Sequence, residues 1–172
     1  MNSQLKCLSF KKLLLPFCLL LCSNLFNNAV IAQEHPPRPI TVAVSTLQHL
    51  NFGTMIPIGS GGTVTVTYDG ARTFSGSIIL PPTGTFSSPA LFQVTALPGT
   101  LITINNGPDV FLSGSNGGTL RLTIGPSKIG SPFITTSAST DVFVGGTLTV
   151  GSIIANPAGY YQGTFTVTFI QQ

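Results

Sequence analysis

The side chains that could take part in acid–base or metal chemistry are few and far apart along this sequence. The chain has four acidic and two imidazole side chains, at Glu34, Asp69, Asp109, Asp141, His35 and His49. General acid–base catalysis needs two titratable groups within hydrogen-bond reach, and only Glu34 and His35 are neighbours. Asp69 and Asp141 fit the preference of aspartate for turns. We therefore expect no catalytic residue, no metal ligand and no cofactor.

Motifs for nucleophiles and phosphates lead to the same expectation. Serine and threonine are plentiful, but no Gly-x-Ser-x-Gly motif occurs to place a serine on a strand-to-helix turn. The glycine-rich stretches separate short β-like segments and do not precede a helix, which disfavours phosphate binding. The sequence thus predicts that the protein is not an enzyme.

Tyr160 and Tyr161 are candidates for a ligand-binding surface, because adjacent aromatic rings can form a platform for a sugar. Neighbours in a strand point to opposite faces, so at most one of the two rings is expected on the surface. The alternative interpretation places one ring in the core and the other at its rim. His49 is interpreted as an edge or loop residue.

The first 32 residues are organised like a secretory signal peptide. Three lysines in the first twelve positions precede an apolar run at residues 13–21, and small or moderate side chains stand at Val30 and Ala32. This pattern predicts cleavage before Gln33 and export to the periplasm, the cell surface or the extracellular space. The apolar run is shorter than the roughly 20 residues that cross a bilayer, so we expect no stable membrane span after signal removal.

Signal removal also changes the charge and the redox chemistry of the chain. All three cysteines lie in the removed segment, so the mature domain has no disulfide. A lipid attachment at Cys22 would need a small residue before it, where Leu21 is bulky. Three of the seven Lys and Arg residues are removed as well, which leaves four basic residues against four acidic ones. A mature net charge of zero offers no basic patch, so no nucleic-acid partner is expected.

Beyond a Pro-rich leader at residues 33–39, short apolar segments are separated by Gly, Pro, Asn and Asp. Asp69-Gly70 between residues 63–68 and 71–76 predicts a hairpin with a two-residue turn. Gly145-Gly146 predicts a second hairpin that joins two further strands, at residues 141–144 and 147–150. Other strands are expected at residues 90–96, 101–105, 109–113 and 119–124.

The last segment alternates most regularly. Phe165, Val167 and Phe169 alternate with Thr164, Thr166 and Thr168, so we expect the first set in the core and the threonines in water. No stretch after the signal peptide shows helical spacing. The sequence therefore predicts an all-β domain at residues 40–172, folded as a single antiparallel β-sandwich.

An ordered series of short motifs extends over most of residues 40–172. It includes Leu50-Asn51-Phe52-Gly53-Thr54-Met55, Val144-Gly145-Gly146-Thr147-Leu148 and Gly159-Tyr160-Tyr161-Gln162-Gly163-Thr164. In these motifs the chain resembles the exported bacterial family called domain of unknown function 4402, which implies no particular reaction. More distantly, it is similar to spore-coat-protein-U-like and chaperone–usher pilin subunits. That similarity implies an immunoglobulin-like or pilin-like sandwich, although Gln171 stands where the pilin pattern has an aromatic residue.

Three functions are compatible with these observations. The first is a non-enzymatic exported surface or pilus-like structural or adhesive subunit, which assembles with like subunits or an assembly chaperone by β-strand donation. The second is a monomeric secreted β-sandwich module that binds a carbohydrate or a protein. The third is a small outer-membrane β-barrel, whose strands would need about 9 to 11 residues.

Residues 40–45 carry the hypothesis of strand donation. Ile40, Val42 and Val44 alternate with smaller or polar residues directly after the Pro-rich leader. These residues either form the first strand of their own sandwich, or donate a strand that fills a groove in the next subunit. In the second case Ile40, Val42 and Val44 would fill the pockets of that groove.

Overall fold

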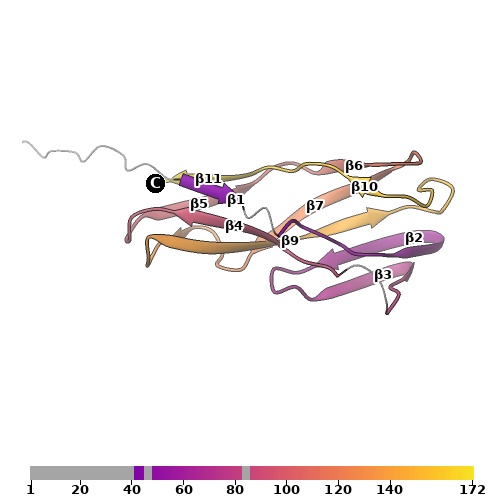
Figure 1. Cartoon of the computed structure of the whole chain (residues 1–172), viewed down its shortest axis with the longest axis horizontal. Helices are drawn as coiled ribbons and strands as arrows, with labels where there is room; N and C mark the ends of the chain where they lie inside the picture. The colour runs from indigo at the N-terminus through magenta and orange to yellow at the C-terminus, as the bar shows by residue number, and fades with distance from the viewer. Residues whose placement is uncertain (1–40, 45–47, 83–85) are drawn as a thin grey trace, which may run out of the picture. The chain divides into compact units, whose positions relative to one another are not determined.

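Every regular element that the structure describes is a β-strand (Figure 1). The structure is a computed structural model that describes residues 41–44, 48–82 and 86–172. The expected signal peptide and leader, together with Ile40, lie outside the described residues. The strands are β1 (Thr41–Val44), β2 (Ile56–Val66), β3 (Arg72–Ile79), β4 (Ala90–Thr95), β5 (Leu101–Asn106), β6 (Val110–Gly114), β7 (Thr119–Ser127), β8 (Phe133–Ile134), β9 (Ser139–Val150), β10 (Tyr161–Gln162) and β11 (Val167–Gln171).

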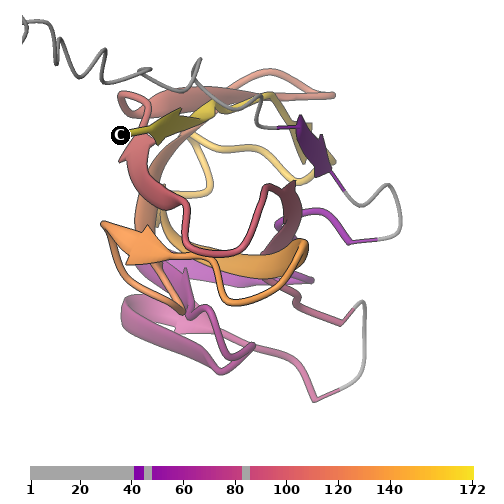
Figure 2. The same cartoon turned by 90° about the vertical axis from the view of Figure 1, so that its left-hand side faces the viewer.

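The strands form two antiparallel sheets, which confirms the prediction of an all-β sandwich. The larger sheet has eight strands, six of them in the order β1-β4-β9-β7-β6-β10, while β2 pairs with β9 and β3 pairs with β2. The smaller sheet has the order β11-β5-β8. The two sheets curl around a shared interior (Figure 2). The core draws on both of them, with fully buried side chains at Val64, Val66, Val94, Val142 and Val144 of the larger sheet and Ile102 of the smaller.

Strand β9 connects most of the larger sheet. Val144 pairs with Ala90 of β4 on one edge and with Ser127 of β7 on the other. From Gly146 onward, β2 takes the place of β4 along the first edge, while β7 continues along the second. β9 therefore has three partner strands, because it is long enough for β4 and β2 to follow each other along one edge.

The prediction of a hairpin turn at Gly145-Gly146 was wrong, because both glycines lie inside the continuous strand β9. A Cβ atom on Gly145 would lie 2.2 Å from the carbonyl oxygen of Val66, and one on Gly146 would lie 3.1 Å from that of Thr123. The two glycines thus allow neighbouring backbones to approach β9 closely, which is the other structural use of glycine in a strand.

The hairpin around Asp69-Gly70 is confirmed, although its loop has three residues instead of two. The Thr67 N–H donates to the Ala71 carbonyl at 2.9 Å, and the Gly70 N–H donates to the Thr67 carbonyl at 3.0 Å. Gly70 has a φ of 86°, as expected for the glycine that ends a three-residue hairpin loop. The Thr67 hydroxyl donates to the Asp69 carboxylate, and this hydrogen bond lowers the pKa of Asp69.

The C-terminal segment runs along β6 and β5, first as β10 and then as β11. Phe165, Val167 and Phe169 are half-buried and pack against the core, whereas the threonines between them are exposed. The Phe92 ring lies 6.3 Å from the Phe165 ring and 5.7 Å from the Phe169 ring, measured between centroids. These ring contacts join the C-terminal segment to β4 of the larger sheet.

Phe165→Ala is expected to lower the free energy of unfolding by about 2 kcal/mol, because a half-buried ring contributes less than the roughly 3–5 kcal/mol of a buried one. Thr166→Ala removes an exposed side chain and should cost less than about 0.5 kcal/mol. Urea denaturation of the two variants provides the comparison. Equal losses at the two positions would contradict the alternation of the segment.

Candidate functional site

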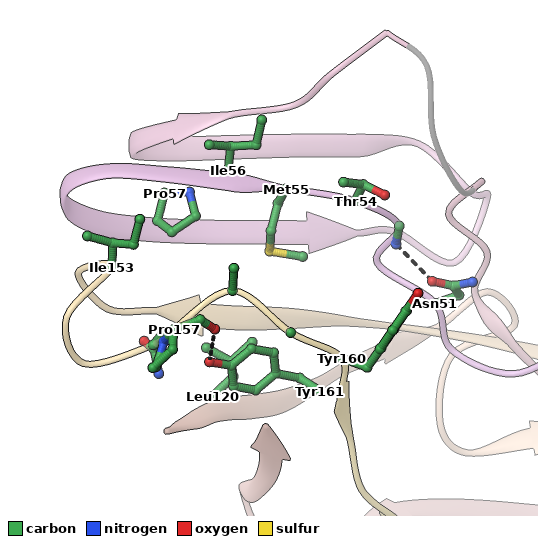
Figure 3. Close-up of a pocket in the computed structure, with 14 residues that line it drawn as sticks. Asn51, Thr54, Met55, Ile56, Pro57, Leu120, Ile153, Pro157, Tyr160 and Tyr161 are labelled. Carbon is green, nitrogen blue, oxygen red and sulfur yellow. Dashed lines mark hydrogen bonds between the residues drawn. The ribbon is translucent and has the colours of Figure 1, made fainter. Parts of the chain in front are cut away.

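A pocket of about 670 Å³ lies between the segment that leads into β2 and the chain that joins β9 to β10 (Figure 3). Its lining combines apolar side chains with two phenols and a few polar groups, and none of the lining residues is acidic or basic. The lining residues are Asn51, Gly53, Thr54, Met55, Ile56, Pro57, Leu120, Ile153, Asn156, Pro157, Ala158, Gly159, Tyr160 and Tyr161.

The first wall, residues 51–57, is held by backbone pairing and by two side chains. Asn51 and Ser88 exchange backbone hydrogen bonds of 2.8 and 2.9 Å. The Asn51 Oδ1 atom accepts the Gly53 N–H at 2.8 Å, while Gly53 has a φ of 67°. The Arg72 guanidinium donates to the Thr54 carbonyl, and its partial burial lowers the pKa of Arg72. This wall is therefore ordered before any ligand arrives.

The second wall is a loop at residues 151–160 that depends on Asn156, which is 7% exposed. The Asn156 Oδ1 atom accepts the Gly151 N–H at 2.5 Å, and its Nδ2 donates to the Thr119 carbonyl at 2.8 Å. The backbone N–H of Asn156 donates to the Ser152 carbonyl at 2.8 Å. One buried amide thus fastens the loop both to the end of β9 and to the start of β7.

The structure brings Tyr160 and Tyr161 to the same pocket with different degrees of exposure. Tyr161 is half-buried, and its hydroxyl donates to the Pro157 carbonyl at 2.7 Å. The Tyr160 side chain is 88% exposed. Its backbone is nevertheless fixed, because the Tyr160 N–H donates to Ser115 Oγ at 3.1 Å and its carbonyl accepts the Ser115 N–H at 2.9 Å. Binding of a ligand by this pair stays a prediction.

The acidic and imidazole side chains of the described residues lie elsewhere. His49 is exposed, and its carbonyl accepts a hydrogen bond from the Ser88 hydroxyl. Asp109 forms a 3.3 Å ion pair with Arg121 on the surface, where such pairs contribute little. Asp141 is exposed on β9. Across residues 48–82 and 86–172, no three His, Cys, Asp or Glu side chains gather as metal ligands would.

Of the residues expected to form a donor strand, Val42 and Val44 lie in β1. They pair with Val94 and Phe92 of β4 in the same chain. Ile40 lies outside the described residues. The described part of the chain includes no helix that is long and apolar enough to cross a membrane.

Sequence reasoning pointed to the two tyrosines but missed most of the pocket. Residues 51–57 and 153–158 come from distant parts of the chain, and their meeting depends on the pairing of β2 with β9. One local signal was present, because Ile153 and Ile154 are apolar residues in a loop. Their side chains are 59% and 89% exposed.

The pocket has features that are typical of a recognition site. It has the size of a small-molecule site, a mostly apolar lining and a few fixed polar groups. Its only titratable side chains are the two tyrosine phenols, and no pair of acid and base faces the cavity. A ligand held here would be bound through shape, ring stacking and neutral hydrogen bonds.

Comparison with known proteins identifies the family. The model of a family described as a domain of unknown function, DUF4402, matches residues 42–170. No curated protein and no solved structure matches the chain significantly. The matched range includes both walls of the pocket and extends over well more than half of the 172 residues. The chain therefore belongs to the DUF4402 family.

Proposed function

We propose that this protein is a non-enzymatic, exported structural subunit of a cell-surface or pilus-like assembly, and that like subunits assemble by exchanging β1. The observation that carries the proposal is the position of β1 in the sheet. It is a four-residue strand, and within the described residues it pairs only with β4. Its exchange would break one short ladder and leave the other pairings of the sheet intact.

The same ladder can form between two copies of the chain. In the closed subunit Thr41, Val42, Ala43 and Val44 pair in order with the residues of β4 from Thr95 back to Phe92. The β1 segment of a neighbouring subunit offers an identical strand to the same edge. Exchange of an identical element between copies has a low energetic cost, because each lost contact is replaced by its equivalent.

The surface beside this edge supports strand exchange as well. Phe92 is paired with β1 through Val44, and its ring contacts the rings of Phe165 and Phe169. Phe165 and Phe169 remain half-buried, and β11 pairs only with β5 among the described strands. In Figure 2, β1 and β11 both lie at the upper side of the domain. An assembly chaperone could pair with this edge of β11 and cover the half-buried rings before like subunits meet.

Cysteine cross-linking tests the exchange directly, because the mature chain would have no native cysteine. Thr41 and Thr95 are directly paired, and Thr95 is exposed. Subunits with Thr41→Cys are mixed with subunits with Thr95→Cys under oxidising conditions. We expect disulfide-linked dimers, since directly paired strand residues have Cβ atoms about 4.5–5.5 Å apart.

Thr123→Cys, on an exposed position of β7, replaces Thr95→Cys in the control mixture and should give no dimer. The double variant Thr41→Cys/Thr95→Cys distinguishes the alternatives. Linked oligomers from this variant support exchange. A disulfide formed only within single chains, with no dimer in the mixing experiment, would show that β1 pairs in its own subunit and would overturn the proposal.

The pocket favours a second candidate function, a monomeric secreted binding module. An exposed aromatic ring beside a preformed apolar cavity is an arrangement typical of ligand recognition. The two candidates differ in the mass of the native protein. A single-subunit mass at high protein concentration favours the binding module, and a ladder of oligomers favours the assembled subunit.

A further inference from the structure

We propose that the pocket between residues 51–57 and 153–161 binds an uncharged saccharide. One sugar ring stacks on the exposed Tyr160 ring, and one of its hydroxyls donates a hydrogen bond to the Asn51 Oδ1 atom. This inference does not depend on strand exchange, because the pocket lies within a single chain and contains no residue of β1.

The charge of the lining selects the class of ligand. None of the residues around the cavity is acidic or basic. Arg72 does not line the cavity, and its guanidinium already donates to the Thr54 carbonyl. A phosphorylated or carboxylated ligand would lose its hydration here without gaining an ion pair, which is unfavourable. A neutral ligand avoids that loss.

Tyr160 provides the stacking surface. Its side chain is 88% exposed, while two hydrogen bonds to Ser115 hold its backbone at 2.9 and 3.1 Å. A rigid, solvent-exposed phenol gives a large contact area at a low entropic cost on binding. The C–H face of a sugar ring can cover this surface, and the half-buried Tyr161, fixed by its hydrogen bond to Pro157, continues the aromatic surface inward.

Asn51 supplies a polar group in a defined direction. Its Oδ1 atom is engaged by the Gly53 N–H at 2.8 Å, so the amide plane is fixed. In Figure 3 this oxygen faces the Tyr160 end of the pocket, whereas Nδ2 points away from the lining. An amide oxygen has two lone pairs, so Oδ1 can also accept a hydrogen bond from a ligand hydroxyl. In Figure 3 the Tyr160 phenol and the Asn51 amide lie at the same end of the pocket. A stacking ring beside a fixed acceptor fits a molecule with one apolar face and a rim of hydroxyls.

The walls argue against an extended peptide as the occupant. Peptides that add to a strand edge depend on a regular series of backbone N–H and C=O groups. Pro57 in the first wall and Pro157 in the second have no N–H, so each interrupts such a series. Recognition at this site must therefore depend on side chains, as it does for a saccharide.

The test is a titration of the isotope-labelled mature chain with lactose, maltotriose and chitotriose, followed by amide NMR shifts. We expect at least one of these saccharides to shift the amides of residues 51–57 and 153–161. Tyr160→Ala should weaken that binding about tenfold, whereas Tyr160→Phe keeps the ring and should retain most of the affinity. Phe111→Ala, at a 65% exposed aromatic residue on β6, is the matched control and should leave the affinity unchanged.

Because Tyr160 is exposed, its replacement should leave amide shifts outside the pocket in place, and this spectrum verifies the fold of the variant. No shift of the pocket amides with any of the three saccharides would overturn the proposal. Equal saccharide affinities of the Tyr160→Ala and Phe111→Ala variants would also overturn the proposal. A synthetic peptide of residues 40–45 serves as the peptide probe. If this peptide bound in the pocket and no saccharide did, the proposal would be rejected. None of these outcomes bears on the cross-linking of Thr41 to Thr95, so the two proposals can fail separately.

Discussion

Gly145→Ala is expected to destabilise the domain by about 4 kcal/mol or more, or to prevent its folding. A Cβ atom at this position would lie 2.2 Å from the Val66 carbonyl oxygen and 2.8 Å from the Thr67 carbonyl carbon. Both contacts are with backbone, which cannot move aside as a flexible side chain can. The ladders that β9 forms with β2 and β4 would have to separate around the new methyl group.

Gly125→Ala is the matched control, because a Cβ atom there would meet nothing closer than 3.4 Å. It should cost less than about 1 kcal/mol. Urea denaturation of both variants measures the difference. Similar midpoints for the two alanine variants would mean that β2 does not approach β9 as closely as the structure has it.

Asn156→Ala is expected to lower the free energy of unfolding by about 2–4 kcal/mol, since it leaves two backbone groups without their partner. The Gly151 N–H would lose its acceptor, and the Thr119 carbonyl would lose its donor. The loop that forms the second wall of the pocket should become mobile as a result. The variant should therefore also weaken any ligand bound beside Tyr160.

Asn105→Ala removes an exposed asparagine of β5 and provides the control, with an expected cost below about 0.5 kcal/mol. Denaturation midpoints and the amide spectrum of residues 151–160 together check this prediction. An unchanged spectrum for the loop in Asn156→Ala would show that its conformation depends on other contacts.

Local sequence patterns were sufficient for most strands but not for the connections between them. The hairpin that contains Asp69-Gly70 was predictable because its two strands and its turn are adjacent in the sequence. Gly145-Gly146 has two possible structural uses, a turn or a close approach of strands. Only the long-range position of Val66 beside Gly145 decides between them, and no local pattern contains that position.

The candidate site was predictable only in part for the same reason. Tyr160 could be identified by its residue type, since an aromatic ring is a common binding surface. Asn51 and Met55 could not, because asparagine after a leucine and methionine before an isoleucine have no special meaning in the sequence. Their role depends on a loop about one hundred positions later, which Asn156 holds in place through its hydrogen bond to Thr119.

The central position of β9 determines the order in which the chain can fold. A polypeptide leaves the ribosome with its N-terminus first, so the β2–β3 hairpin emerges long before β9, the second partner of β2. Thr65 of β2 and Thr147 of β9 are 82 residues apart, and their hydroxyls share a hydrogen bond of 3.0 Å. Until β9 emerges, the edge of β2 that pairs with it has no backbone partner. The apolar side chains of Val64 and Val66 are then exposed to water. We therefore expect the larger sheet to form only once β9 is available, with the slow folding that is typical of a high contact order and with a risk of aggregation before that point.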